Sequence, residues 1–156
     1  MNRAVSCLFV ALVGGLVAHT SALAQSSALE QNKVLAQRFH LEMIAQGKLD
    51  IADEIIAPDC VIHSPGGLGT TKGPERARQM AAGDLKAYPK GIKITHDVVF
   101  GEGDLVGFHW TFVGTRETGE ERQLEGLDVV RISNGKITQM WIEYHSPDQH
   151  RKPQPQ

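Results

Sequence analysis

Four consecutive segments in the second half of the chain have the residue pattern of β-strands. Each is rich in β-branched and aromatic residues, and short turn-like sequences separate them. The segments are Ile92–Glu102, Leu105–Thr115, Arg122–Ile132 and Lys136–His145. The Asn134-Gly135 pair between the last two strongly favours a tight hairpin turn. Strands joined in this way predict a meander, and therefore an antiparallel sheet.

The first half of the chain predicts helices. Ser27 and Glu30 form a capping-box pattern, and apolar residues at helical spacing follow, so we expect a helix that ends near Gly47. The remaining expected elements are a helix at Leu49–Ile56, a strand at Cys60–His63, a loop at Ser64–Gly73 and a helix from Pro74 to Tyr88. Helices gathered first and strands last predict an α+β domain. In such a domain a curved antiparallel sheet packs on the helices and leaves a pocket between the layers.

The first 24 residues are expected to form a signal peptide. Arg3 gives a positive start, an apolar run follows from Ala4 to Val17, and Ala22-Leu23-Ala24 matches the small-residue cleavage pattern. The run is shorter than the roughly 20 residues that a membrane-spanning helix needs. We therefore expect a periplasmic or secreted protein without a membrane span after processing. Its domain would occupy residues 25–148, followed by a disordered tail at 149–156.

Charge and cysteine content exclude two classes of protein. Loss of Arg3 with the signal peptide changes the formal net charge from −2 to −3, whereas a nucleic-acid-binding surface requires a basic face. The expected mature chain retains Cys60 as its single cysteine, so an internal disulfide cannot form. Stability must then come from the apolar core.

Three polar residues within strand-like segments are the candidate catalytic residues. His63 ends the first strand, and His109 and Asp128 lie within otherwise apolar strands, where an unpaired polar group is costly. Strict alternation places Gly107 beside His109 and Gly126 beside Asp128, which would leave space for a ligand. If the two faces coincide, His109 and Asp128 form an acid/base pair, since a carboxylate and an imidazole perturb each other's pKa.

Other interpretations of these residues remain open. The pair could be structural and satisfy itself in the core, or His63, His109 and Asp128 could form a metal site of two histidines and a carboxylate. His96 shares a strand face with apolar residues and is a candidate pocket residue, whereas we expect His40 on the surface. If His109 faces the pocket, the opposite face of its strand meets a partner subunit, because it carries the large apolar residues Val106, Phe108, Trp110 and Phe112.

Several segments in order resemble the SnoaL-like, or polyketide cyclase-like, family of the nuclear transport factor 2-like superfamily. They are Cys60-Val-Ile-His-Ser-Pro65, Glu102-Gly-Asp-Leu-Val-Gly-Phe-His109 and Leu127-Asp-Val-Val-Arg-Ile-Ser-Asn-Gly-Lys-Ile-Thr-Gln-Met-Trp141. The resemblance covers about Asn32 to Tyr144. It implies a cone-shaped α+β barrel (nuclear transport factor 2-like or cystatin-like), a homodimer, and activity without a cofactor. Its namesakes close polyketide rings by an aldol step with an acidic residue as acid/base.

The resemblance also suggests roles for individual residues. Trp141 would line the pocket, and Glu143, on the same strand face, would replace the acid that many relatives carry directly after the tryptophan. His63 would bind the carbonyl oxygen of the substrate. The first hypothesis is therefore a cofactor-independent lyase, isomerase or cyclase that acts on a small, mostly apolar carbonyl compound. The alternative is a non-catalytic domain that binds such a molecule.

Overall fold

The computed structural model describes residues 11–65 and 72–147, with side chains from residue 25 onward. The expected tail at 149–156, the first ten residues of the expected signal peptide and most of the Ser64–Gly73 loop lie outside the described residues. In the part of the chain that is described, no helix is long and apolar enough to cross a membrane.

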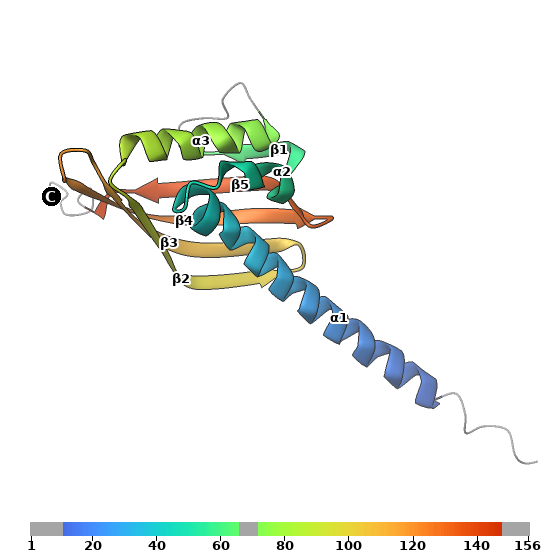
Figure 1. Cartoon of the computed structure of the whole chain (residues 1–156). Coiled ribbons are helices and arrows are strands. Elements are labelled where there is room, and N and C mark those ends of the chain that lie inside the picture. Colours follow the sequence, from blue (N-terminus) through green and yellow to red (C-terminus); the bar gives the residue numbers. More distant parts are fainter. Residues whose placement is uncertain (1–10, 66–71, 148–156) are drawn as a thin grey trace, which may run out of the picture.

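Helices occupy most of the first half of the chain, as expected. They are α1 (Ala11–Arg38), the π-helical segment η1 (Phe39–Ile44), the 3-10 turn η2 (Leu49–Ile51), α2 (Ala52–Ile55) and α3 (Gly73–Ala87). The expected helix start at Ser27 is wrong for the full chain, because the preceding residues are themselves helical and α1 continues through Ser27 without a cap. Figure 1 shows the C-terminal part of α1 lying against the sheet, where it contacts β2, β3 and β4.

The strands form one five-stranded sheet in the order β1-β5-β4-β3-β2. Their bounds are β1 (Ile56–His63), β2 (Ile92–Glu102), β3 (Leu105–Thr115), β4 (Glu121–Ser133) and β5 (Lys136–His145). Strands β2 to β5 form the predicted antiparallel meander. The prediction of a wholly antiparallel sheet is wrong at one edge, where β1 pairs with β5 in parallel. Helix α3 separates β1 from the meander, so β1 is free to join the last strand instead of the first.

The hairpin between β4 and β5 has the predicted turn. Asn134 and Gly135 both have positive φ angles, 51° and 69°. A two-residue hairpin turn of the favoured type needs this left-handed backbone at both central positions, and Asn and Gly adopt it at low cost. The sequence motif therefore determines the turn, which fixes the register of the last two strands.

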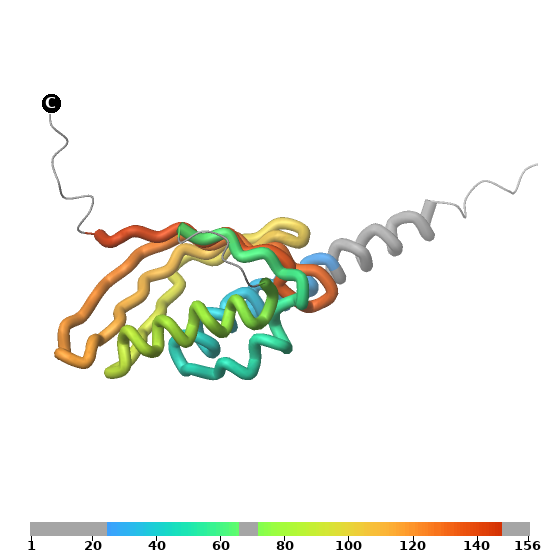
Figure 2. The backbone as a smooth tube through the Cα atoms, turned by 90° about the horizontal axis from the view of Figure 1, so that it is seen from above, coloured from blue at the N-terminus to red at the C-terminus, as the bar shows by residue number. Residues whose placement is uncertain are grey.

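The sheet curves around the helices, which cover one of its faces (Figure 2). We call the helix-covered face the inner face and the opposite one the outer face. The core lies between the helices and the inner face, and its largest fully buried apolar side chains include Phe39, Met43, Ile55, Phe108 and Met140. The outer face carries exposed apolar side chains at Val98, Phe100 and Leu127.

A β-bulge in β2 changes which side chains face inward. His96 pairs with Trp110 and Val98 pairs with His109, so Asp97 is the extra residue between two consecutive pairs. Before the bulge, Ile94 and His96 point to the inner face. After it, Val98 and Phe100 are exposed, although strict alternation from His96 would have placed them inside.

Candidate active site

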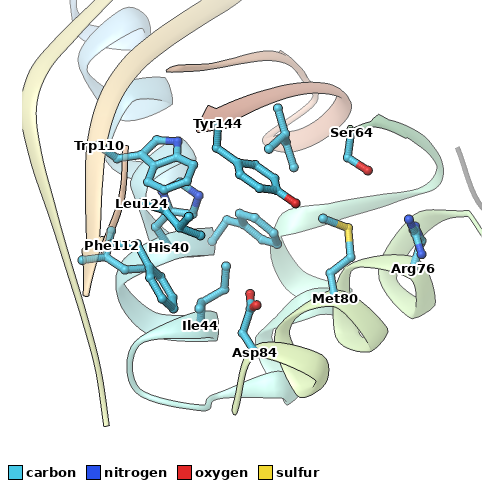
Figure 3. A pocket seen from close by; sticks show the side chains of 13 residues that line it. His40, Ile44, Ser64, Arg76, Met80, Asp84, Trp110, Phe112, Leu124 and Tyr144 are labelled. Carbon is cyan, nitrogen blue, oxygen red and sulfur yellow. The ribbon is translucent and has the colours of Figure 1, made fainter. Parts of the chain in front are cut away.

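A cavity of about 270 Å³ lies between the inner face of the sheet and the helices. Most of its lining is apolar, and a few polar side chains from different elements reach it (Figure 3). The lining residues with polar or ionisable groups are His40, Ser64, Arg76, Asp84, Trp110 and Tyr144. A concave, mostly apolar site with a few converging polar groups is typical of small-molecule binding.

Local periodicity explains how these side chains reach the cavity. On α3, Arg76, Met80 and Asp84 are four residues apart, so they lie on one helix face and point toward the sheet. On β5, Ile142 and Tyr144 are two residues apart and share the inner face. Figure 3 shows the carboxyl group of Asp84 and the hydroxyl group of Tyr144 both directed into the cavity.

Asp84 is the carboxyl group of the cavity lining, and its environment changes its acidity. Burial raises the pKa of this carboxyl above its usual value of 3.8, and the nearby His40 opposes the shift in part. A carboxylate that is poorly solvated holds a proton more strongly and is therefore a stronger base. The cavity thus contains an ionisable group whose properties suit proton transfer.

His40 lies in the wall of the cavity and is almost fully buried, with 4% of its surface exposed. It belongs to the π-helical segment η1, in which the amide of Ala45 donates to the carbonyl of His40. Its ring contacts the rings of Phe39, Phe108 and Trp110. The expectation that His40 lies on the surface is wrong, because helical spacing places it on the same face as Met43 and Ile44.

Asp128 is fully buried beneath His40. Its Oδ1 accepts a hydrogen bond from the indole N–H of Trp110 at 2.8 Å, and its Oδ2 lies 3.3 Å from Nε2 of His40. No side-chain hydrogen bond of standard geometry reaches Oδ2. In the described part of the chain, His40 is the one basic partner within ion-pair distance of this carboxyl group. If this buried carboxyl group is ionised, a protonated neighbour is needed to compensate for its charge.

The predicted His109–Asp128 pair does not form. Leu127 pairs with His109 and Asp128 pairs with Phe108, so the two polar residues lie on opposite faces of the sheet. His109 is on the outer face, where its Nδ1 is 2.7 Å from Oδ1 of Asp97, the bulge residue. The face with Val106 and Phe108 is the inner one and is buried in the core of this chain. The sequence did not decide this because both faces of β3 carry apolar residues.

His63, Trp141 and Glu143 also lie away from the cavity. His63 and Trp141 are neighbours in the β1–β5 register, and their rings stack with centroids 5.7 Å apart. Glu143 is exposed and lines a shallow outer hollow beside His109. The predicted placement of these residues around one pocket is therefore wrong. For the same reason His63, His109 and Asp128 cannot bind one metal ion together.

The glycines beside the candidate residues accommodate aromatic rings instead of a ligand. A Cβ at Gly107 would lie 2.2 Å from the ring of Phe100, and a Cβ at Gly126 would lie 2.4 Å from the indole of Trp110. In both cases the ring belongs to the directly paired residue of the neighbouring strand. The space that the sequence suggested is real, but the protein's own side chains fill it.

His96 faces inward, as expected for a pocket residue, but it lies behind His40. Its Nε2 is 3.0 Å from Nδ1 of His40, and its Nδ1 is 3.2 Å from Oε1 of Gln37. Burial is the main cause that lowers the pKa of His96 to about 4, and the neighbouring His40 lowers it further. His96 is therefore neutral at pH 7.

Sequence reasoning missed His40, Asp84 and Tyr144, although each carried a usable signal. His40 follows Ala36 by four residues, and Asp84 follows Ala77 and Ala81 by seven and three, so both share a helix face with small buried residues. Tyr144 continues the alternation of Met140 and Ile142. Polar residues that share a face with the apolar residues of a helix or strand were therefore the ones that indicated the cavity lining.

Comparisons with known proteins agree with this fold. The fold is an α+β fold of the nuclear transport factor 2-like class, with helices packed on a curved mixed sheet. The chain belongs to the SnoaL-like polyketide cyclase family, whose sequence model matches residues 34–149. A search of curated proteins finds no match.

Solved structures of similar fold come from proteins with different described activities. IdmH of Streptomyces antibioticus, a candidate polyketide cyclase, has 25% identity and a TM-score of 0.62 over 73% of this chain and 91% of its own. A candidate polyketide cyclase of Acidithiobacillus ferrooxidans has 21% identity and a TM-score of 0.65 over 73% and 87%. An epoxide hydrolase of M. tuberculosis has 15% identity and a TM-score of 0.62 over 76% and 85%.

Proposed function

We propose that the cavity binds a small, mostly apolar carbonyl compound and that Asp84 acts on it as the acid/base catalyst. The chain would then be a cofactor-independent lyase, isomerase or cyclase. The observation that carries this proposal is the position of the Asp84 carboxyl group, which points into a mainly apolar cavity and has a raised pKa. Such a group is suited to remove a proton next to a carbonyl at neutral pH.

The other polar groups support the same chemistry. In the proposed step, the Asp84 carboxylate takes the proton from the carbon next to the carbonyl, and the electron pair of that C–H bond moves toward the carbonyl oxygen. The hydroxyl of Tyr144, which is directed into the cavity, would donate a hydrogen bond to this oxygen. The resulting enolate can regain the proton elsewhere, expel a leaving group or attack a second carbonyl, which correspond to isomerase, lyase and cyclase activity.

The family description supports the cyclase outcome, and the described activities of proteins with a similar fold keep the reaction class broad. Two similar structures are described as candidate cyclases and a third as an epoxide hydrolase. The identity of the substrate must therefore be established by experiment.

A non-catalytic binding domain is the second candidate. The observation in its favour is that both ring nitrogens of His40 already face other side chains, His96 and Asp128, so this histidine does not offer a nitrogen to a ligand. Under this alternative the cavity would hold the ligand without proton transfer. The two candidates differ in what Asp84 does.

Proton exchange tests the reaction class without knowledge of the substrate. Incubation of the full-length protein with cyclohexanone or 1-indanone in D₂O should replace the hydrogens next to the carbonyl with deuterium, which proton NMR follows. The Asp84→Asn variant should lose at least about 100-fold of this exchange rate, as expected when a general base is removed. His109→Gln, a change on the outer face, serves as the control and should leave the rate unchanged. Undiminished exchange in Asp84→Asn would exclude Asp84 as the base, and absence of exchange in the wild type would favour the binding alternative.

We further propose that two copies associate through the outer face. The exposed apolar residues Val98, Phe100 and Leu127 lie on this face, which favours contact with another protein surface. Replacement of Phe100 and Leu127 by serine should then shift the protein from dimer to monomer in analytical ultracentrifugation.

Export by a cleaved signal peptide is likewise a proposal that rests on residues 1–24. Mass spectrometry of the protein recovered from the periplasm or culture medium of an expressing bacterium should find a chain that begins at or close to Gln25. Recovery of a chain with Met1 at its start would contradict it.

A further inference from the structure

A chain of polar side chains runs behind the wall of the cavity. It starts at a backbone carbonyl of α1 and ends on β3, and it consists of Gln37, His96, His40, Asp128 and Trp110. The amide nitrogen of Gln37 is 3.0 Å from the carbonyl oxygen of Lys33, and the distances from Gln37 to His96 and from His96 to His40 are 3.2 and 3.0 Å. Each of these three contacts requires one donor and one acceptor, as does the contact from Trp110 to Asp128 at 2.8 Å, whereas His40 Nε2 and Asp128 Oδ2 are 3.3 Å apart, within ion-pair distance.

The backbone carbonyl of Lys33 determines which group donates and which accepts in the hydrogen bonds of this row of side chains. A carbonyl can only accept, so Gln37 must turn its NH₂ group toward Lys33 and its Oε1 toward His96. Since Oε1 also only accepts, Nδ1 of His96 must carry a proton. The reversed orientation of Gln37 would bring two acceptor oxygens together at 3.0 Å.

The position of the proton on His96 determines which nitrogen of His40 must donate. Because burial holds the pKa of His96 at about 4, the ring carries a single proton at neutral pH, and that proton is on Nδ1. Its Nε2 is then an acceptor, and Nδ1 of His40 must be the donor across the 3.0 Å contact. The tautomer of His40 is therefore determined by an acceptor three hydrogen bonds away, the backbone carbonyl of Lys33.

At the next contact a proton has to be shared. With Nδ1 of His40 protonated, an uncharged ring would present the lone pair of Nε2 to Oδ2 of Asp128 at 3.3 Å. Two lone pairs at this distance in a buried site repel each other, and a proton between them removes the repulsion. The other oxygen of Asp128 accepts from Trp110, and imidazole is in general a stronger base than a carboxylate. The proton therefore belongs to His40.

We propose that Gln37 and His96 are positioning residues that hold His40 in one protonation state, a ring with protons on both nitrogens paired with the Asp128 carboxylate. Three ionisable groups face His40 from the surrounding elements: Asp128 on β4, His96 on β2 and Asp84 on α3. Both nitrogens of His40 are held by protein partners. His40 therefore acts on the cavity through its positive charge and not by proton transfer.

This charge deepens the proposed function, on which the following step rests. When Asp84 removes a proton, negative charge develops on the ligand oxygen inside an apolar cavity, where few groups can compensate for it. A fixed imidazolium in the wall stabilises that charge without any rearrangement during the reaction. The charge on His40 therefore favours ligands that form an oxyanion in the cavity, such as an enolate or a phenolate.

Ring nitrogen NMR tests the protonation state directly, independently of any reaction. The full-length protein is labelled with ¹⁵N, and the His40 and His96 signals are assigned with His40→Gln and His96→Gln variants. At pH 7 we expect both ring nitrogens of His40 to be protonated, and His96 to be protonated on Nδ1 only. An unprotonated Nδ1 or Nε2 on His40 overturns the proposal.

Gln37 variants test the positioning role. Gln37→Met removes the acceptor and should give His96 a mixture of tautomers, whereas Gln37→Glu keeps an acceptor oxygen and should restore the proton on Nδ1. Gln79→Met, the same replacement at an exposed glutamine of α3, is the matched control. An unchanged His96 signal in Gln37→Met contradicts the role of Gln37. If thermal unfolding shows that Gln37→Met does not fold, the wild-type ring signals decide the proposal alone.

An anionic probe tests the role of the charge separately from catalysis. In the Asp84→Asn background, which cannot support the proposed proton transfer, the affinities for 4-nitrophenolate and nitrobenzene are compared with and without Gln37→Met. We expect Gln37→Met to weaken phenolate binding by about fivefold or more, the effect of a nearby displaced charge, and to leave nitrobenzene binding unchanged. Equal effects on both probes, or no phenolate binding, contradict the charge role. Absence of proton exchange in the wild-type protein would contradict the proposed function of Asp84, and it would leave the result of the phenolate comparison unaffected.

Discussion

The indole of Trp110 occupies the space in which a side chain at Gly126 would begin. The two residues are paired across β3 and β4, and a Cβ at Gly126 would lie 2.4 Å from the ring and 2.5 Å from the carbonyl oxygen of Glu143. The absence of this side chain allows the indole to reach Asp128 along the inner face and to donate its N–H group. Gly126 thereby supports both a wall of the cavity and a buried hydrogen bond.

Replacement of Gly126 by alanine should therefore destabilise the protein. Neither the indole nor the backbone carbonyl can move away easily, so we expect the free energy of unfolding to fall by about 1–3 kcal/mol. Urea denaturation measures the change. Gly83→Ala is the control, because nothing lies within 4 Å of a Cβ there, and within α3 it should be neutral or stabilising by up to about 1 kcal/mol. Equal stability changes in the two variants would refute the packing argument.

Asp84→Asn should make the protein more stable at neutral pH while it removes the proposed base. Burial raises the pKa of Asp84, so the folded protein holds this proton more strongly than the unfolded chain does. The ionised carboxylate therefore weakens the fold once the pH rises through the raised pKa, and this cost is absent below the usual value of 3.8. Denaturation at pH 7 and at pH 3.5 should show a gain for the variant only at the higher pH. A gain of the same size at both values would mean that ionisation is not its cause.

His96 should make the protein less stable in mild acid. Its pKa falls from 6.5 to about 4 on folding, mainly through burial, so the unfolded chain binds a proton in this range and the folded chain does not. The free energy of unfolding is therefore complete above pH 6.5 and falls toward pH 4, by at most about 3 kcal/mol. His96→Gln should flatten this part of the stability curve against pH. An equally steep curve in the variant would assign the loss to other groups.

His109→Gln should change neither proton exchange nor stability greatly. His109 lies on the outer face with Asp97, where its hydrogen bond lowers the pKa of that exposed carboxyl. Exposed pairs of this kind contribute little to stability, because water and salt screen them. Exchange assays and urea denaturation together provide the check. A large loss of exchange would restore a catalytic role to a residue that the structure places outside the cavity.

The sequence predicted the elements of this fold better than the faces of its strands. The bounds of β2, β3 and β5 agree with the predicted segments because turn residues mark their ends. The faces of β3 were assigned wrongly because the polar His109 was expected to face the pocket, whereas the more apolar face with Val106 and Phe108 is the one buried in the core. A β-bulge at Asp97 added a second difficulty, because alternation counted from Ile94 gives the wrong face after His96.

The prediction of the candidate site was wrong for a related reason. His109 and Asp128 were paired on the assumption that their strand faces coincide, but Asp128 pairs with Phe108 and lies on the opposite face from His109. The glycine neighbours were taken to leave space for a ligand, but Phe100 and Trp110 fill that space from the neighbouring strands. A single sequence does not say which ring will cross to which glycine. Asp84 was not considered, although it shares a helix face with the buried Ala77 and Ala81.

The bulge at Asp97 also has a consequence for how relatives of this protein can differ. Because one extra residue separates the inward His96 from the outward Val98 and Phe100, deletion of that residue would exchange the two sides over half of the strand. The histidine that orients His40 and the apolar residues of the outer surface could then not both keep their places. A single-codon deletion at this point would therefore alter the interior chemistry and the exterior surface together, which links two properties that would otherwise be free to diverge.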